Sequence, residues 1–193
     1  VILFTVFAIV IQQNHESMVS QGKQRSRVLA TPPKKVLIGV SWPFAKAKDG
    51  FANGLNLALE EINTQNLLGN TKLSLIMKDD EDEWRVARKI ALDFAARPNM
   101  LAVIGYRNDD IAIMASTLYE KAKLLHIIAG ATSISMTKHS YNYLIRTIPS
   151  SEKLIHSLSA QSSNRGGKYA VIWGTDSHSE ELAENYKIAQ NSE

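Results

Sequence analysis

The 193-residue sequence contains no cysteine, which excludes disulfide bonds, thiolate metal sites and a cysteine nucleophile. It also lacks the glycine patterns that cradle phosphate, since the segment SWPFAKAKDG (41–50) has neither G-x-G-x-x-G nor a Walker Gly-Lys-Ser/Thr. No G-x-S-x-G nucleophile elbow occurs, and the histidines do not stand at the spacing of metal ligands. The sequence therefore predicts no cofactor, no metal site and no catalytic residue.

The sequence has little net charge once its N-terminal end is set apart. The formal net charge is +3, but residues 1–35 hold five lysines and arginines against one acid, so the rest of the chain is close to neutral. A polyanion partner would need basic residues on the folded part. Nucleic acid is therefore not a predicted partner.

The N-terminal apolar run, VILFTVFAIVI (1–11), is shorter than the roughly 20 residues that cross a bilayer. Its length is typical of the core of a signal peptide or the remnant of a membrane anchor, with a buried strand as the alternative. A polar stretch without periodicity follows it. We therefore predict a leader and polar linker over residues 1–34 and a periplasmic or other extracytoplasmic location, with cleavage or anchoring in the membrane both open.

From residue 35 onward, short apolar runs alternate with segments of helical spacing. Six runs predict strands, at 35–40, 73–80, 100–106, 124–130, 141–149 and 168–174. Amphipathic segments between and after them predict helices, at 51–63, 84–94, 111–119, 151–161 and 179–190. This alternation predicts an α/β fold, a doubly wound and mostly parallel sheet with helices on both faces.

Ligands of such sheets bind at the carboxyl ends of the strands, beside the point where the strand order reverses. Four polar stretches take such positions, at 41–48, 79–83, 105–110 and 130–135. The acid cluster KDDEDE (78–83) suits either a divalent cation or the N-terminus of the next helix, and capping or solvation is favoured.

Two of these stretches carry the candidate site. In GYRNDD (105–110), Asp109 or Asp110 is expected to cap the next helix, but two acids and Arg107 exceed what a cap needs. In AGATS (129–133), free N–H groups and two hydroxyls can receive a carboxylate or an amide, although a tight turn explains them as well. His178 follows an apolar run where a ligand could meet it, whereas His126 lies inside one and is expected to be packed.

The order of these pieces resembles the type I periplasmic binding proteins, in the branch that binds leucine, isoleucine and valine or senses amides. The resemblance covers about Lys35 to the end of the chain, and its sharpest parts are EIN, KDD before a helix, AVIG, AGAT and RTIPS. It implies two α/β lobes that close on a ligand about a hinge. The first lobe would cover residues 35–149, and residues 150–193 would begin a second lobe that the chain does not complete.

The resemblance also implies ligand-binding residues. In the family, hydroxyls and N–H groups of the AGAT loop hold a ligand carboxylate. The resemblance implies that this loop corresponds here to Ala129, Gly130, Ala131 and Thr132. The chain departs from the family in the loop after AVIG, where Arg107, Asp109 and Asp110 stand in place of serines. His178 takes the place of an aromatic residue, and Trp42 and Phe44 are the stand-ins for the side-chain pocket. An acid here would repel a carboxylate, so a cationic or amide-like ligand is expected.

The predicted function is that of an extracytoplasmic protein without catalytic activity, which traps a small polar molecule and delivers it to an ABC-type permease. An amino acid, an amide or a related amine is the expected ligand. A ligand-sensing ectodomain coupled to a signalling domain is the alternative within the same family. A non-nucleotide α/β enzyme and a degenerate copy that binds nothing are the alternatives of other classes.

Overall fold

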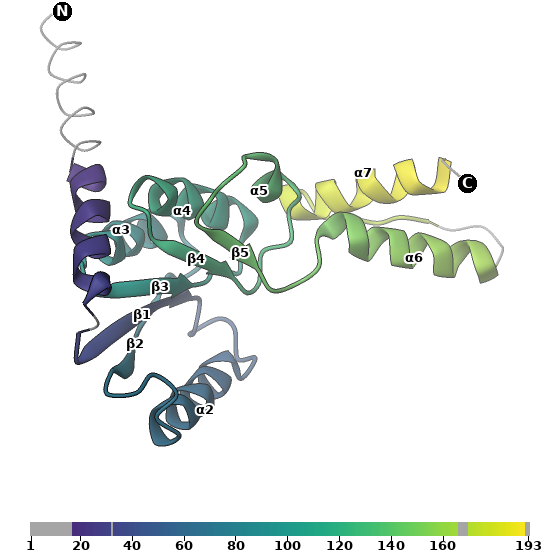
Figure 1. Cartoon of the computed structure of the whole chain (residues 1–193). Coiled ribbons are helices and arrows are strands. Elements are labelled where there is room, and N and C mark those ends of the chain that lie inside the picture. The colour runs from purple at the N-terminus through teal and green to yellow at the C-terminus, as the bar shows by residue number, and fades with distance from the viewer. Residues whose placement is uncertain (1–16, 32, 166–169, 192–193) are drawn as a thin grey trace, which may run out of the picture.

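The structure, a computed structural model, describes residues 17–31, 33–165 and 170–191 (Figure 1). Its centre is a five-stranded sheet in the order β2-β1-β3-β4-β5. The strands are β1 (Lys35–Trp42), β2 (Lys72–Asp79), β3 (Met100–Ile104), β4 (Leu125–Ile128) and β5 (Leu144–Arg146). All four neighbouring pairs run parallel, which confirms the predicted sheet.

Helices cover both faces of this sheet (Figure 1). They are α2 (Phe51–Thr64), α3 (Trp84–Ala95), α4 (Asp109–Lys121), the short α5 (Ser135–Lys138), α6 (Ser151–Arg165) and α7 (Ser177–Asn191). Figure 1 shows α3 and α4 together on one face and α2 on the other, while α6 and α7 extend as a pair beyond β5. The doubly wound arrangement predicted from the alternating pattern is thus confirmed.

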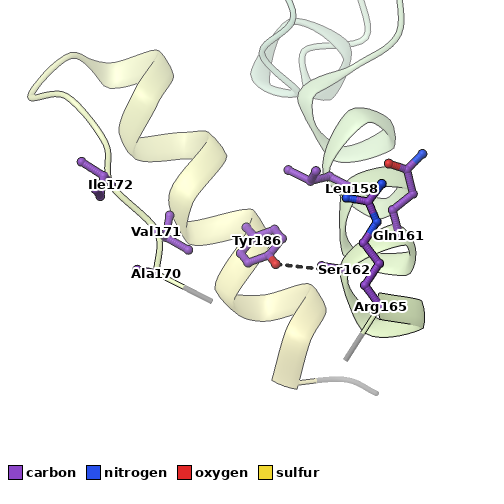
Figure 2. Close-up of a pocket in the computed structure, with 8 residues that line it drawn as sticks. All are labelled: Leu158, Gln161, Ser162, Arg165, Ala170, Val171, Ile172 and Tyr186. Atoms are coloured by element: carbon purple, nitrogen blue, oxygen red, sulfur yellow. Dashed lines mark hydrogen bonds between the residues drawn. The ribbon is translucent and has the colours of Figure 1, made fainter. Parts of the chain in front are cut away.

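The sixth predicted strand, at 168–174, is the exception. Its described part, residues 170–174, forms no strand, so that prediction is wrong there. Figure 2 shows Val171 and Ile172 on an irregular segment beside α7. No strand of the described chain lies next to this segment. Without an adjacent strand, its backbone N–H and C=O groups lack the partners that a strand needs.

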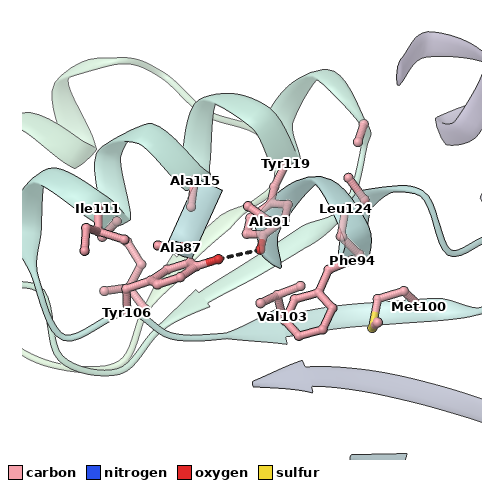
Figure 3. Packing of buried hydrophobic residues seen from close by; sticks show 14 of the residues in the cluster. Ala87, Ala91, Phe94, Met100, Val103, Tyr106, Ile111, Ala115, Tyr119 and Leu124 are labelled. Carbon is pink, nitrogen blue, oxygen red and sulfur yellow. Dashed lines mark hydrogen bonds between the residues drawn. The ribbon is translucent and has the colours of Figure 1, made fainter. Parts of the chain in front are cut away.

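The main core lies between the sheet and the pair α3 and α4 (Figure 3). Ala87, Ala91 and Phe94 on α3 are fully buried because they recur at helical spacing on one face. A Cβ atom at Gly39 of β1 would lie 2.8 Å from the Phe94 ring, so the glycine allows α3 to approach the sheet closely. At the far end of the core, the hydroxyls of Tyr106 and Tyr119 are 2.7 Å apart, which satisfies two buried polar groups.

His126 is fully buried on β4 and is packed as the sequence predicts. Its Nε2 donates to the carbonyl oxygen of Gly105 over 3.0 Å, and its Nδ1 lies 2.9 Å from the Ser116 hydroxyl. Burial lowers the pKa of His126 to about 4, against the raising effect of the Gly105 carbonyl. The imidazole is therefore a neutral link between β4, α4 and the end of β3.

The polar stretch before β1 differs from the predicted linker, because residues 17–30 form a helix. Arg25 anchors it, although arginine is rarely buried, and its side chain donates to four backbone carbonyls. Nε donates to Met100 O (3.0 Å), Nη2 to Ala95 O (2.7 Å) and Arg97 O (3.2 Å), and Nη1 to Ala122 O (2.5 Å). The stretch predicted as a polar linker without periodicity is therefore helical over residues 17–30.

The sequence of this helix shows no hydrophobic stripe, because its two buried positions are Gly22 and Arg25. A Cβ atom at Gly22 would lie 3.0 Å from Ala122 O, so the backbones pass close together there. The helix covers the amino ends of β3 and β4, the edge opposite the candidate site. The apolar run 1–11 lies outside the described residues. Among the described residues, no helix has the length and apolar character needed to cross a membrane.

Candidate functional site

The candidate site lies where the strand order reverses. The chain leaves β1 toward β2 on one side and returns to β3 on the other, so the carboxyl ends of β1 and β3 flank the reversal. In sheets of this kind that edge holds the ligand crevice. The loops 105–110 and 129–135, which follow β3 and β4, meet there.

Asp109 forms the hydrogen bonds that connect these two loops. Its side chain is 7% exposed, and its Oδ1 accepts hydrogen bonds from the backbone N–H groups of Thr132 (2.7 Å) and Ser133 (3.1 Å). Its Oδ2 accepts from Nδ1 of His178 over 2.8 Å. Asp109 therefore ties the start of α4 to the AGAT loop and to the start of α7.

Asn108, rather than either aspartate, caps α4. Its side-chain oxygen accepts from the N–H of Ile111 over 3.2 Å, so the expectation that Asp109 or Asp110 caps this helix is wrong. Asparagine suits the extended backbone and short reach of this position. Because the cap is supplied elsewhere, the Asp109 carboxylate is available for the AGAT loop.

A second acid, Glu181 on α7, holds the same loop from the other side. Its carboxylate accepts from the hydroxyls of Ser133 (2.6 Å) and Ser151 and from the N–H of Ile134 (3.3 Å). Burial alone would raise the pKa of Glu181, but these hydrogen bonds outweigh burial and lower the pKa. Arg146 completes the frame by donating to the carbonyls of Thr132 (3.2 Å) and Ser133 (2.9 Å).

A cavity of about 590 Å³ opens beside this frame. Its lining includes six of the residues predicted from the sequence, namely Arg107, Asp109, Asp110, Gly130, Thr132 and His178. Asn108, Asp82 and Asp176 complete it. Its charged groups are four carboxylates against one guanidinium and one imidazole, and the imidazole is already bonded to Asp109.

The other predicted residues lie apart from this cavity. Ala131 is fully buried, and its N–H donates to Tyr106 O over 3.1 Å. Ala129 and Trp42 line a neighbouring cavity of about 460 Å³. Trp42 is 4% exposed, with its ring 4.1 Å from that of Phe51 and its Nε1 donating to Asp49 over 3.1 Å.

The two cavities adjoin at Gly130. A Cβ atom on this residue would lie 2.6 Å from the Trp42 ring and 2.9 Å from the Cα of Arg107, and each of these residues lines one of the two cavities. Glycine is thus the residue that fits between the two walls. Beyond it, Phe51, Gly54 and Leu55 of α2 line the smaller cavity and make it largely apolar.

The acid cluster at 78–83 does not cap α3 through a side chain. Asp80 is buried instead, with its carboxylate accepting from the Ser41 hydroxyl (3.0 Å) and from the N–H of Asp82 (3.1 Å). Burial raises the pKa of Asp80. Across the described chain, no group of three histidines, cysteines or acids is placed to hold a metal ion.

A further cavity, of about 340 Å³, lies between α6 and α7 (Figure 2). Leu158, Val171 and Ile172 contribute to its lining, and the Tyr186 hydroxyl donates to Ser162 Oγ over 2.8 Å. None of the predicted site residues lines it.

Sequence patterns did not single out Asn108 and Glu181. Glu181 stands three residues after His178, a spacing that places both on one face of a helix. That spacing is the signal that could have found it. Asn108 immediately precedes the helical pattern, where asparagine is a preferred cap, so position alone could have identified it.

The chain is similar to known binding proteins. The model of the family described as "Receptor family ligand binding region" matches residues 52–166. An amino acid binding protein of Pseudomonas aeruginosa is 26% identical over 81% of this chain and 43% of its own length. A leucine-specific-binding protein of Salmonella typhimurium is 31% identical over 67% of this chain and 34% of its own length. The chain therefore spans less than half the length of either relative.

Solved structures show the same similarity. An ABC transporter substrate-binding protein of Desulfitobacterium hafniense, in complex with Leu, superposes with a TM-score of 0.77 and 36% identity. The match covers 82% of this chain and 48% of that one. A leucine-binding protein of Thermotoga maritima has a TM-score of 0.69 at 17% identity, over 81% of this chain and 46% of its own, and supports the fold alone.

Proposed function

Because the chain belongs to the receptor ligand-binding-region family, among the type I periplasmic binding proteins, we propose that it forms the first lobe and part of the second lobe of a solute-binding protein. The complete protein traps a small polar molecule, an amino acid, an amide or a related amine, between two lobes. It delivers this molecule to an ABC-type permease from an extracytoplasmic location. The observation that carries the proposal is the family match to a chain whose polar cavity lies at the ligand edge of the sheet.

The contacts across the cavity support trapping. Residues 35–149 supply Asp109 and Thr132, while His178 and Glu181 come from the segment that we assign to the second lobe. Hydrogen bonds join the two parts at Asp109–His178 and Ser133–Glu181. Opening and closing of the two parts would take place about the segment 147–150, which connects them.

The geometry favours binding over catalysis. A hydroxyl nucleophile needs a histidine that accepts its proton on one ring nitrogen while an acid holds the other nitrogen. Here Thr132 Oγ1 (3.5 Å) and Asp109 Oδ2 (2.8 Å) both approach the same nitrogen, Nδ1 of His178. The imidazole cannot pass a proton between them as a catalytic triad does.

Thermal unfolding of the full-length protein tests the proposal. A panel of amino acids, amides and amines is added, and at least one class is expected to raise the melting temperature, since a ligand at 100 times its Kd stabilises by about 2.7 kcal/mol. Thr132→Val, which removes a hydroxyl from the cavity, should reduce that shift. Thr137→Val makes the same chemical change at an exposed position and should leave the shift intact. No shift with any class would contradict the proposal.

A further inference from the structure

We propose that the ligand carries an amine or an amide and no free carboxylate, because Asp109 already occupies the backbone donors that would hold an anion. The inference rests on the proposed function and narrows its ligand class. Relatives bind amino acids or leucine by name, so it predicts a difference between this chain and proteins of the same fold.

The backbone donors of the AGAT loop are already in use. Two successive backbone N–H groups that converge on one point form an anion-binding concavity. Those of Thr132 and Ser133 converge on Asp109 Oδ1, at 2.7 and 3.1 Å. The carbonyls of the same two residues accept from Arg146, so the loop is fixed on both sides. A ligand carboxylate would have to displace a buried carboxylate of this chain.

The lining of the larger cavity carries an excess of negative charge. Asp82, Asp109, Asp110 and Asp176 face the 590 Å³ cavity, and Arg107 is its one guanidinium. An added carboxylate would enter a site with an excess of negative charge, whereas an ammonium group or the N–H groups of an amide would meet acceptors. The lining therefore favours a donor-rich head group over an acceptor-rich one.

The smaller cavity offers room for the apolar part of the ligand. The adjoining cavity of about 460 Å³ is lined by Trp42, Phe51 and Leu55, together with Asp49, whose carboxylate accepts from Trp42 Nε1, and it meets the acidic cavity at Gly130. An apolar chain of leucine size suits such walls. The two cavities together fit an amide or amine with a branched apolar tail.

Isothermal titration of the full-length protein separates the alternatives with four matched probes. These are leucine, leucinamide, 3-methylbutylamine and 4-methylpentanoate, which share a branched tail and differ in head group. We expect leucinamide to bind at least tenfold more tightly than leucine, and 4-methylpentanoate not to bind. Equal or tighter binding of leucine or 4-methylpentanoate would overturn the inference and leave the proposed function standing. Absence of binding by all four and by the wider panel would overturn both.

Asp109→Ser tests the cause. It frees both N–H groups and removes one negative charge, so the leucine-to-leucinamide preference should shift at least tenfold toward leucine. Asp109→Asn keeps an acceptor oxygen for the two N–H groups of the loop, so this variant should still bind leucine weakly. Asp93→Ser removes an exposed acid of α3 and is the control. An unchanged preference in folded Asp109→Ser would contradict the assignment, and the wild-type titrations decide it if that variant does not fold.

Discussion

Acid should destabilise this protein through His126, by an amount that can be worked from its burial. The pKa of His126 is lowered by burial from 6.5 to about 4. Between these two values the unfolded chain binds a proton that the folded protein does not, so stability falls as the pH falls. The difference of about 2.5 units corresponds to about 3 kcal/mol, fully present above pH 6.5 and lost as the pH falls toward and through 4.

Urea unfolding at a series of pH values between 7.5 and 4 measures this loss. His126→Gln removes the ionisable ring and keeps an amide donor for Gly105 O, so its stability should approach that of the wild type as the pH falls. The gap between the two proteins should change by about 3 kcal/mol across the range. His156→Gln removes an exposed histidine of α6 and serves as the control. A gap that stays constant from pH 7.5 to 4 would refute the account of His126.

Two further predictions concern stability elsewhere. Arg25→Ala leaves four backbone carbonyls without their donor and should cost about 3 kcal/mol in urea unfolding, whereas Arg27→Ala at an exposed position should cost little. Equal effects would contradict the docked helix. Gly130→Ala forces a Cβ atom against the Arg107 backbone and the buried Trp42 ring. It should lower the free energy of unfolding by about 1–3 kcal/mol and should also weaken ligand binding. Gly54→Ala, in a helix with open space around it, should instead stabilise by about 0.5–1 kcal/mol, and the reverse order would contradict the packing at the site.

The sheet could be predicted from the sequence because its strands are continuous apolar runs that recur between amphipathic helices. Residues 36–40 of β1 are an example, since all five are buried or half-buried and both faces of the strand are covered. The helix at 17–30 could not be predicted in this way. Its contact with the core depends on a glycine and on the guanidinium of Arg25, and neither contributes to a hydrophobic stripe.

The candidate site was predictable in its location and in part of its chemistry. Strand ends in a parallel sheet meet at one edge, so the loops 105–110 and 129–135 were expected together. The bond from Asp109 to the AGAT loop joins residues 23 positions apart and depends on the exact pose of two loops. Local sequence carries no such information. Trp42, the predicted stand-in for the side-chain pocket, lines the adjoining apolar cavity.

The most direct test of the central claim is a map of where a solute binds. Amide ¹H–¹⁵N spectra of the full-length protein would be recorded with increasing leucinamide. We predict shifts centred on the cavity of the AGAT and GYRNDD loops, at Arg107, Asn108, Gly130 and Thr132. Shifts centred on the α6–α7 cavity around Leu158, or no shifts at saturating concentration, would contradict the claim that this edge of the sheet is the binding site.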